Sequence, residues 1–507
     1  MNVFADLSPE RRALLELLLI EEALGERPAE KAPAPEAAPL SFGQERLWLL
    51  DRLDPGSPAY NTATALRLLG PLDPQILARS FTEIARRHAV LRTVFREEMG
   101  RPAQVVTEPR PVELPVTGLS GEEALAAGID EEVRRPFDLA QGPLFRARLF
   151  RLGAEEHVLV IAMHHIVSDA WSMGVLAGEL TALYAAFAAG RPSPLPELPI
   201  QYADHARRQR ERLDGPALEE QLAWWRERLT GAPEVLEVPT DRPRPPVRRF
   251  RGGMRTRKLP RELSAAAARL STERSATPFM VLLAAFEVLL HARTGATDLV
   301  VGVDVANRDE PETEALIGFF LNQLVLRVDA SGDPTFLDLL ERAREASLGA
   351  FAHRDLPFGR LVEELSPQRS LARNPLFQVM FGFYNVPEPQ AEDLGRLQIV
   401  PLDLDGGTAV FDLSLYLAET PEGLLATLRY DADLYEVATA ERLLEDFEIV
   451  AARALESPEG RISDLTRHLM EERRRRLEAG REALQQARLR TLKTARRRTL
   501  GANGDQE

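Results

Sequence analysis

Residues 157–172 read HVLVIAMHHIVSDAWS, and this stretch decides the fold. Its apolar first part is typical of a buried strand. Two histidines, His164 and His165, stand where that strand ends, and Asp169 follows four residues after the second. A helix is expected to begin near Ser172. Polar side chains therefore lie between a strand end and a helix start, where rigid scaffolds present reactive groups.

The two adjacent histidines are expected to have different surroundings. Neighbouring side chains of a strand point to opposite faces, so only one of the pair can face a given cleft. A single histidine on an apolar strand is usually a satisfied core residue. The HHxxxD spacing favours a general base instead, because imidazole titrates near neutral pH.

Two other chemistries are disfavoured at this site. The histidine pair lacks the i, i+4 spacing of a zinc-binding helix, and the chain has no cysteine. Ser168 and Ser172 are candidate nucleophiles, but neither lies in a G-x-S-x-G turn.

The run at residues 163–172 resembles the HHxxxDG motif of nonribosomal peptide synthetase condensation domains. Further segments resemble the other motifs of that family, in the family's order, at residues 40–50, 87–95, 202–206, 317–322, 353–358 and 373–376. The resemblance covers about residues 40–465, and seven motifs in order are much more specific than one alone.

Alternating strands and helices imply a layered α/β body. The resemblance implies two chloramphenicol acetyltransferase-like lobes that form a V-shaped pseudo-dimer with a central tunnel, plus short helical extensions at both termini. The expected segments are an N-terminal helical docking-like segment at 1–25, a flexible linker at 26–39, an N-terminal lobe with the HHxxxD site at 40–230, a Pro-rich inter-lobe crossing at 231–250, a C-terminal lobe at 251–465 and a basic helical tail at 466–507.

Local composition supports the outer boundaries. Ser8 and Pro9 are typical of a helix start, and the prolines of 239–246 cannot continue a helix or a central strand. Residues 471–498 hold eleven Lys and Arg against four Glu. This tail is expected to be either a solvated charged helix or a docking helix for an acidic partner.

Overall composition limits the function classes. The chain has 507 residues, a net charge of −15 and no cysteine. The charge argues against nucleic acid as the main partner, and the lack of cysteine excludes disulfides and thiolate metal sites. No apolar run reaches ~18 residues, and the N-terminus lacks a signal-peptide pattern, so a cytoplasmic protein without membrane spans is expected.

The resemblance implies roles for the site residues. His165 faces the tunnel as the catalytic histidine, and His164 packs behind it. Asp169 points away from the substrate and pairs with an arginine, for which Arg92 and Arg308 are both candidates. Trp171, Ser172 and Asn322 are expected to support the site.

Two positions depart from the family pattern. Ala170 stands where the family usually has Gly; it keeps the backbone N–H expected to stabilise an oxyanion, but it loses easy access to positive φ. Gln323 stands where the family often has Thr, and we interpret this as a change in the tunnel wall.

The implied reaction is acyl transfer from a thioester to an amine or a hydroxyl, without a metal or a cofactor of the protein's own. The acyl group arrives on the phosphopantetheine arm of a donor carrier protein, and the acceptor arrives on a second carrier or as a free molecule. The chain lacks a carrier motif, so both carriers are expected to act in trans. The terminal helices are expected to contact other synthetase modules. The chain is interpreted as a free-standing condensation enzyme or the condensation part of a longer synthetase.

Other functions of the same fold remain open. An epimerisation domain shares the HHxxxD motif, but the residues after Asp169 favour condensation. A non-catalytic scaffold that recruits tailoring enzymes to a carrier is a second alternative, although such relatives usually lose the second histidine. Heterocyclisation is disfavoured, because those relatives replace the histidine pair with aspartates.

Overall fold

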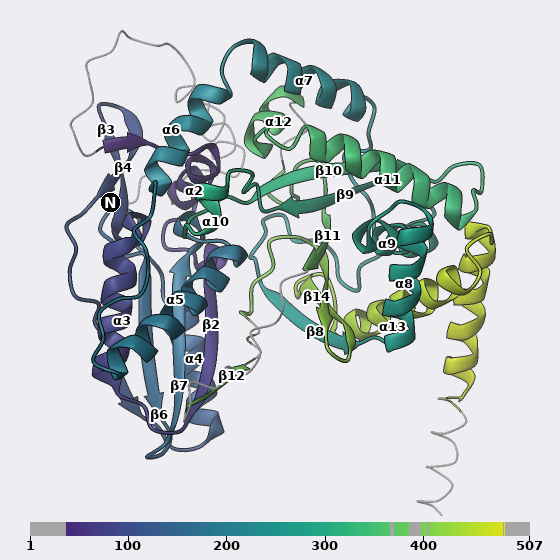
Figure 1. Ribbon diagram of the computed structural model, residues 1–507. Coiled ribbons are helices and arrows are strands. Elements are labelled where there is room, and N and C mark those ends of the chain that lie inside the picture. The colour runs from purple at the N-terminus through teal and green to yellow at the C-terminus, as the bar shows by residue number, and fades with distance from the viewer. Residues whose placement is uncertain are drawn as a thin grey trace, which may run out of the picture.

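The computed structural model describes residues 37–365, 370–384, 397–402, 404, 406–479 and 481. The helical segment expected at 1–25, the linker as far as residue 36 and the tail from 482 onward lie outside the described residues. Figure 1 shows two lobes, each built around its own sheet, with helices over the sheet faces.

The first lobe contains a five-stranded sheet in the order β12-β2-β7-β6-β5. Its strands are β2 (Asn61–Leu69), β5 (Val116–Gly118), β6 (Phe145–Arg151), β7 (Glu156–His164) and β12 (Gln398–Leu402). A separate three-stranded sheet joins β1 (Ala37–Pro39), β4 (Arg101–Val106) and β3 (Thr93–Glu98).

Strand β7 is buried on both faces. Leu159 and Ile161 pack in the core that includes α3 (Pro74–Arg87) and α5 (Ala170–Ala188). Val158 and Val160 pack on the opposite side, in a smaller core with α4 (Glu122–Arg134). Burial of both faces explains the unbroken apolar run, and the strand predicted there is confirmed.

The second lobe is built on a six-stranded sheet in the order β10-β9-β11-β13-β14-β8. Its strands are β8 (Gly252–Lys258), β9 (Asp298–Val305), β10 (Asn322–Asp329), β11 (Val379–Tyr384), β13 (Leu413–Thr420) and β14 (Gly423–Asp431). The helices that join this core include α8 (Arg261–Glu273), α9 (Pro278–Thr294), α11 (Phe336–Ala352) and α13 (Val437–Glu456).

Helix α9 begins as its sequence predicts. Thr277 is the N-cap, and its hydroxyl accepts the backbone N–H of Met280 at 3.3 Å, with Pro278 in the first turn. From Met280 to Leu290 every residue of α9 is buried. Within the described part of the chain no single helix is long and apolar enough to cross a membrane; α8 and α9 reach that composition only as a pair bent by 110°.

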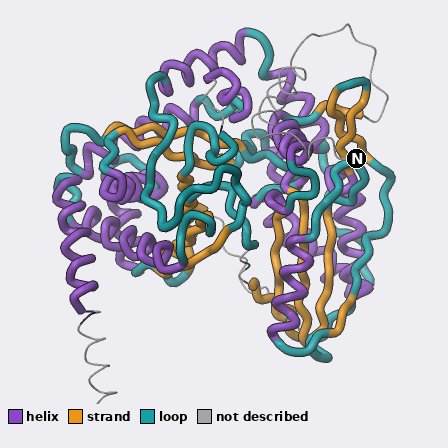
Figure 2. Tube along the Cα trace, turned by 180° about the vertical axis from the view of Figure 1, so that it is seen from behind, coloured by secondary structure: helices purple, strands orange, loops and turns teal. Residues whose placement is uncertain are grey.

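The chain divides between the lobes differently from the expected boundary at residue 230. Helix α7 (Pro216–Leu229) already belongs to the second core, where Trp225 is 1% exposed and donates its indole N–H to the His353 carbonyl at 3.0 Å. Conversely, strand β12 belongs to the second half of the sequence but pairs with β2 in the sheet of the first lobe. These exchanges depend on pairings across long sequence separations, which local patterns do not reveal. Figure 2 shows from behind that helices flank the strands of each lobe.

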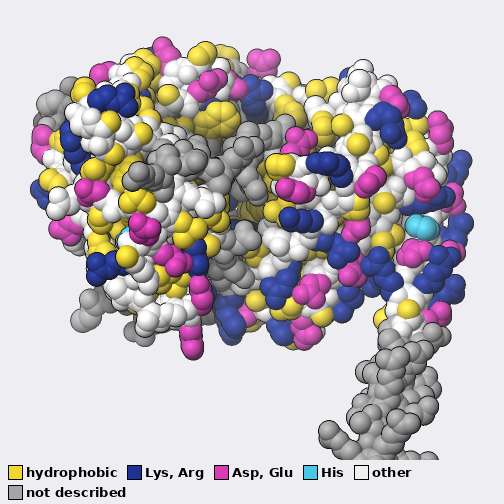
Figure 3. Space-filling model, turned by 60° about the horizontal axis from the view of Figure 1, so that its bottom comes forward, with side chains coloured by type: hydrophobic (Ala, Val, Ile, Leu, Met, Phe, Trp, Pro, Cys, Tyr) yellow, Lys and Arg dark blue, Asp and Glu magenta, His cyan; other side chains and the backbone are white. Residues whose placement is uncertain are grey.

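The basic tail is partly attached to the second lobe. Residues 462–479 are helical, and Leu465 and Leu469 are buried in the second core. Arg473 and Arg476 form ion pairs with Asp446 and Glu445 of α13, at 3.7 and 3.1 Å. Figure 3 shows Lys and Arg side chains gathered where this helix leaves the lobe.

Glycine at position 302 is required for the packing of β9. A Cβ added to Gly302 would lie 2.1 Å from the ring of Phe377, which is 1% exposed. We predict that Gly302→Ala lowers the free energy of unfolding by about 1–3 kcal/mol, because the buried ring has to move. Urea denaturation measures this change.

Gly174, in α5, is the matched control, because a Cβ there would meet no atom within 4 Å. Gly174→Ala is expected to raise the free energy of unfolding by about 0.5–1 kcal/mol, as in other helices. Equal effects of the two substitutions would contradict this account of the β9 packing.

Candidate active site

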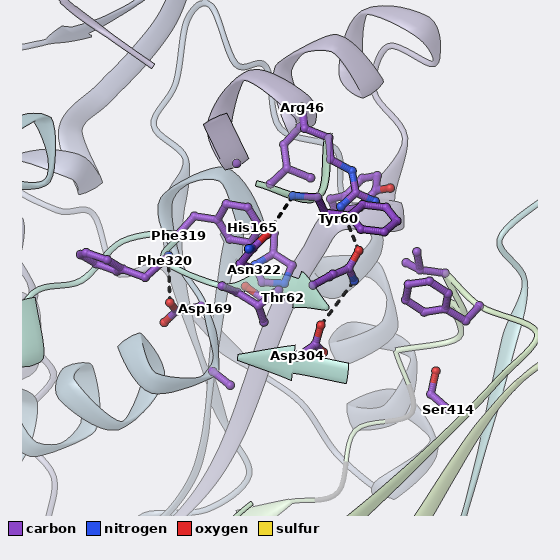
Figure 4. Close-up of a pocket in the computed structure, with 18 of the residues that line it drawn as sticks. Arg46, Tyr60, Thr62, His165, Asp169, Asp304, Phe319, Phe320, Asn322 and Ser414 are labelled. Carbon is purple, nitrogen blue, oxygen red and sulfur yellow. Dashed lines mark hydrogen bonds between the residues drawn. The ribbon is translucent and has the colours of Figure 1, made fainter. Parts of the chain in front are cut away.

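A cavity of about 490 Å³ lies between the lobes, and side chains of both line it (Figure 4). The lining residues from the first lobe include Arg46, His165, Asp169 and Ala170, and those from the second half of the chain include Asp304, Phe319, Asn322, Gln323, Asp355, Tyr384, Ser414, Tyr416 and Arg429.

His165 stands in the wall of this cavity, in the short 3-10 turn that follows β7. Its Nδ1 lies 2.5 Å from the backbone carbonyl of Ser168. A carbonyl can only accept, so Nδ1 carries the proton and Nε2 keeps a free lone pair. The ring packs edge-on against Phe319, with centroids 4.8 Å apart.

The imidazole of His165 is held in its neutral form. Burial lowers its pKa below the usual value, against the opposing effects of the Ser168 carbonyl and the Asp169 carboxylate. A neutral ring with a free Nε2 can accept a proton from a molecule in the cavity.

His164 lies behind this wall and does not line the cavity. Its side chain is 3% exposed, and its Nδ1 accepts the backbone N–H of Ile166 at 3.1 Å. Burial, aided by the neighbouring His165, lowers its pKa to about 3. The two histidines thus face different surroundings, as strand alternation predicts.

Asp169 anchors three separate segments. Its Oδ1 accepts the Ser172 backbone N–H at 2.8 Å and so caps α5. Its Oδ2 accepts the Phe320 backbone N–H at 3.1 Å. The Arg308 guanidinium forms an ion pair with Oδ1 at 3.1 Å, and both side chains are at most 3% exposed. The carboxylate therefore has its charge and its acceptor sites fully satisfied within the protein.

Of the two arginines expected to pair with Asp169, the structure selects Arg308. Arg92 instead donates to the backbone carbonyl of Thr107, at the end of β4, so its assignment to the site is corrected. Arg308 is further held by the carbonyls of Thr313 and Leu316, at 2.5 and 2.7 Å.

The remaining residues of the motif have structural contacts. Trp171 is 41% exposed and donates its indole N–H to the Glu314 carbonyl at 2.9 Å, outside the cavity. Ser168 and Ser172 are both fully buried, which leaves neither hydroxyl accessible as a nucleophile. The Ser172 hydroxyl lies 2.7 Å from Asp169 and accepts the Gly318 N–H at 3.0 Å.

Helix α5 begins at Ala170, two residues before the start expected from the sequence, because Asp169 serves as its N-cap. Ala170 is therefore in a helical conformation and is not among the residues with positive φ. The lost access to positive φ has no consequence here. Ala170 also lines the cavity, at the end of the helix where backbone N–H groups lack partners within the helix.

A loop from the second half of the chain closes the first lobe behind His165. Residues 316–320, here called the latch loop, supply Leu316, Ile317, Phe319 and Phe320 to the first core. Tyr202 donates its hydroxyl to the Phe319 carbonyl, and its ring leaves no room for a side chain at Gly318. Motifs far apart in sequence thus meet at one loop.

Asn322 and Gln323 follow the latch loop, and their side chains have different kinds of partner. The Asn322 side chain bonds the backbone of Arg354, Leu356 and Phe358, at 2.8 to 3.0 Å, so it positions that loop. Gln323 accepts from Arg46 at 2.9 Å and donates to Asp304 at 3.3 Å.

Sequence reasoning missed Arg46 and Asp304 as parts of the cavity wall. Asp304 lies in a strand, and its polar character within an apolar run was the available signal. Among the described residues, no group of three or more His, Asp or Glu is placed to hold a metal ion.

The comparisons with known proteins agree with this architecture. The family model "Condensation domain" matches residues 35–477. A linear gramicidin synthase protein of Brevibacillus parabrevis is 46% identical over 435 residues, which are 84% of this chain and 6% of that protein. The chain thus spans a small part of this relative's length.

Solved structures are similar over most of the chain. The X-domain from teicoplanin biosynthesis, in its complex with OxyB, is 32% identical with a TM-score of 0.77, covering 87% of this chain and 98% of that one. The first condensation domain of the CDA synthetase is 25% identical with a TM-score of 0.73, covering 84% and 98%.

The Asp169 anchor generates a stability prediction. Asp169→Asn should lower the free energy of unfolding by about 3–5 kcal/mol, because Arg308 is left as a buried, unpaired charge. Chemical denaturation monitored by tryptophan fluorescence measures the loss. A variant that unfolds like the wild type but lacks activity would instead make Asp169 a direct participant in the chemistry.

Proposed function

This chain belongs to the condensation domain family of the nonribosomal peptide synthetases, and from that premise we propose that it catalyses acyl transfer. The donor is an acyl or peptidyl thioester on the phosphopantetheine arm of a carrier protein. The acceptor is an amine, which yields an amide, or a hydroxyl, which yields an ester. Both substrates enter the cavity between the lobes.

One observation carries the proposal: His165 lines the cavity, and the contact of its Nδ1 with the Ser168 carbonyl favours the tautomer in which Nε2 is unprotonated. This nitrogen takes the proton of the acceptor amine as the amine attacks the thioester carbonyl. The tetrahedral intermediate then collapses, the C–S bond breaks, and the proton passes to the leaving sulfur. The products are the amide and the free thiol.

Other groups of the site assist this step. The first backbone N–H groups of α5, beside Ala170, are proposed to stabilise the oxyanion of the intermediate. A thioester is already activated, so no covalent enzyme intermediate is needed. Alignment of two large substrates in one cavity supplies much of the remaining acceleration.

A scaffold role is a second candidate, and one comparison favours it. The X-domain, 32% identical to this chain, is described in a complex with OxyB. A scaffold requires no proton acceptor in the cavity, so the reaction itself discriminates between the two roles. Two loaded carriers incubated with this protein and followed by intact-protein mass spectrometry should show transfer of the donor acyl group onto the acceptor carrier.

His165→Ala is the variant that tests the catalytic role. Loss of a general base should reduce the turnover rate roughly 10²-fold, with little change in the affinity for either carrier. His291 is the matched control, because its Nδ1 also bonds a backbone carbonyl, that of Ala296 at 2.8 Å, but it lies in α9 away from the cavity. His291→Ala should retain full turnover. A near-normal rate in His165→Ala would assign catalysis to substrate alignment alone.

The pH dependence gives a second test of the same residue. Burial holds the pKa of His165 below its ordinary 6.5, so more than half of the base is unprotonated at pH 6.5. The ratio of wild-type to His165→Ala rates, in which the titration of the substrate cancels, should reach a plateau at high pH and fall to half of that plateau at a pH below 6.5. A half-maximal ratio above pH 6.5 would contradict the assignment.

A further inference from the structure

A row of side chains crosses the cavity-facing surface of the second lobe's sheet. Gln323 of β10 pairs with Asp304 of β9, and Tyr416 of β13 pairs with Gly382 of β11 and Thr427 of β14. The parallel strands β9 and β11 join these pairs: Val303 is opposite Phe381, so one step further Asp304 stands beside Gly382.

Gly382 has no side chain, and this leaves room in the row for the ring of Tyr416. A Cβ there would lie 2.6 Å from the Tyr416 ring, so the ring occupies the space above the glycine and lies next to Asp304. Tyr384, two residues along β11 on the same face, stacks on Tyr416 with ring centroids 5.4 Å apart. Asp304, Tyr384 and Tyr416 all line the cavity.

The Asp304 carboxylate differs from the other described acids of the cavity wall. Among the described residues three acids line the cavity, and two of them have arginine partners: Asp169 pairs with Arg308, and Asp355 pairs with Arg212 at 3.4 Å. Within the described residues, Asp304 forms no ion pair, and its hydrogen-bond partner is the neutral amide of Gln323.

Two arginines line the cavity near this row, and among the described residues neither forms an ion pair with Asp304. The charge of Arg46 acts on Asp304 from a distance, and that of Arg429 acts on both tyrosines. Arg46 donates to the side-chain carbonyl oxygen of Gln323, while the amide nitrogen of Gln323 faces Asp304. The Arg46 guanidinium also stacks over Phe358, 4.8 Å from the ring centroid. Arg429 stands one row away, opposite Ser414. One negative charge beside two aromatic faces therefore remains for a molecule in the cavity.

We propose that Asp304, Tyr384 and Tyr416 form a subsite for a positively charged side chain of one of the two substrates. A carboxylate and aromatic rings together recognise an ammonium or guanidinium group, by charge and by cation–π attraction. This inference rests on the proposed function for the identity of the ligand as a substrate. The subsite itself is defined by residues that take no part in the acyl transfer step.

Binding of unreactive probes tests the subsite. Lysinamide and norleucinamide differ by the side-chain ammonium alone, and isothermal titration calorimetry compares their affinities. Lysinamide should bind the wild type about tenfold more tightly, which is the effect of about 1.4 kcal/mol expected for one charged contact. Asp304→Asn should abolish this difference and leave norleucinamide binding unchanged. Asp355→Asn is the matched control, because Asp355 also lines the cavity but is paired with Arg212. This variant should keep the tighter binding of lysinamide over norleucinamide.

Acid should weaken the preference for lysinamide, because a proton competes with the cation for the carboxylate. Burial raises the pKa of Asp304 to about 6, so the affinity ratio should fall towards one below that pH. The other groups facing Asp304 do not titrate in this range: burial raises the pKa of both tyrosines, and an arginine side chain does not lose its proton near pH 6.

Several outcomes would overturn the subsite. These are equal binding of the two probes, no binding of lysinamide, or an equal loss of both probes in Asp304→Asn. The result is separable from the proposed function. A lysinamide preference together with no transfer between loaded carriers would retain the subsite and reject acyl transfer. Transfer without the lysinamide preference would retain acyl transfer and reject the subsite.

Discussion

The buried ion pair of Asp169 and Arg308 is the constraint on which the site depends. The carboxylate caps α5, holds the guanidinium and accepts the N–H of Phe320 in the latch loop. These contacts fix a helix of the first lobe, the segment after β9 and a loop that crosses between lobes. Removal of either charge leaves the other buried without a partner, so the three segments are held together or released together.

This anchor leaves His165 free for chemistry. The residues between the histidine and the aspartate form a short turn, and within it the Ser168 carbonyl, not Asp169, orients the imidazole. The motif thus separates two tasks that a catalytic triad combines: a carbonyl selects the tautomer, while the carboxylate holds the scaffold. The separation explains why the carboxylate can be buried and fully paired beside a histidine that lines the cavity.

Local patterns predicted what depends on local sequence. The β7 strand follows from its apolar run, and the family follows from its ordered motifs. The assignment of α7 to the second lobe and the pairing of β12 with β2 depend on distant contacts and were not predicted. Asp304 was missed for the same reason, because its neighbours Gln323 and Tyr416 are brought to it by the sheet.

The sheet of the second lobe explains how recognition can vary without loss of the fold. Side chains alternate along β9, so Val303 points into the core while Asp304 faces the cavity. A change at position 304 therefore alters the charge of the cavity wall and leaves the packing of the core face intact. The first lobe, in contrast, carries His165 and Asp169, and the Asp169 carboxylate is held by Ser172, Phe320 and Arg308. The proposed base and the proposed cation subsite thus lie on opposite walls of one cavity, so a change in the subsite need not disturb the contacts that hold His165.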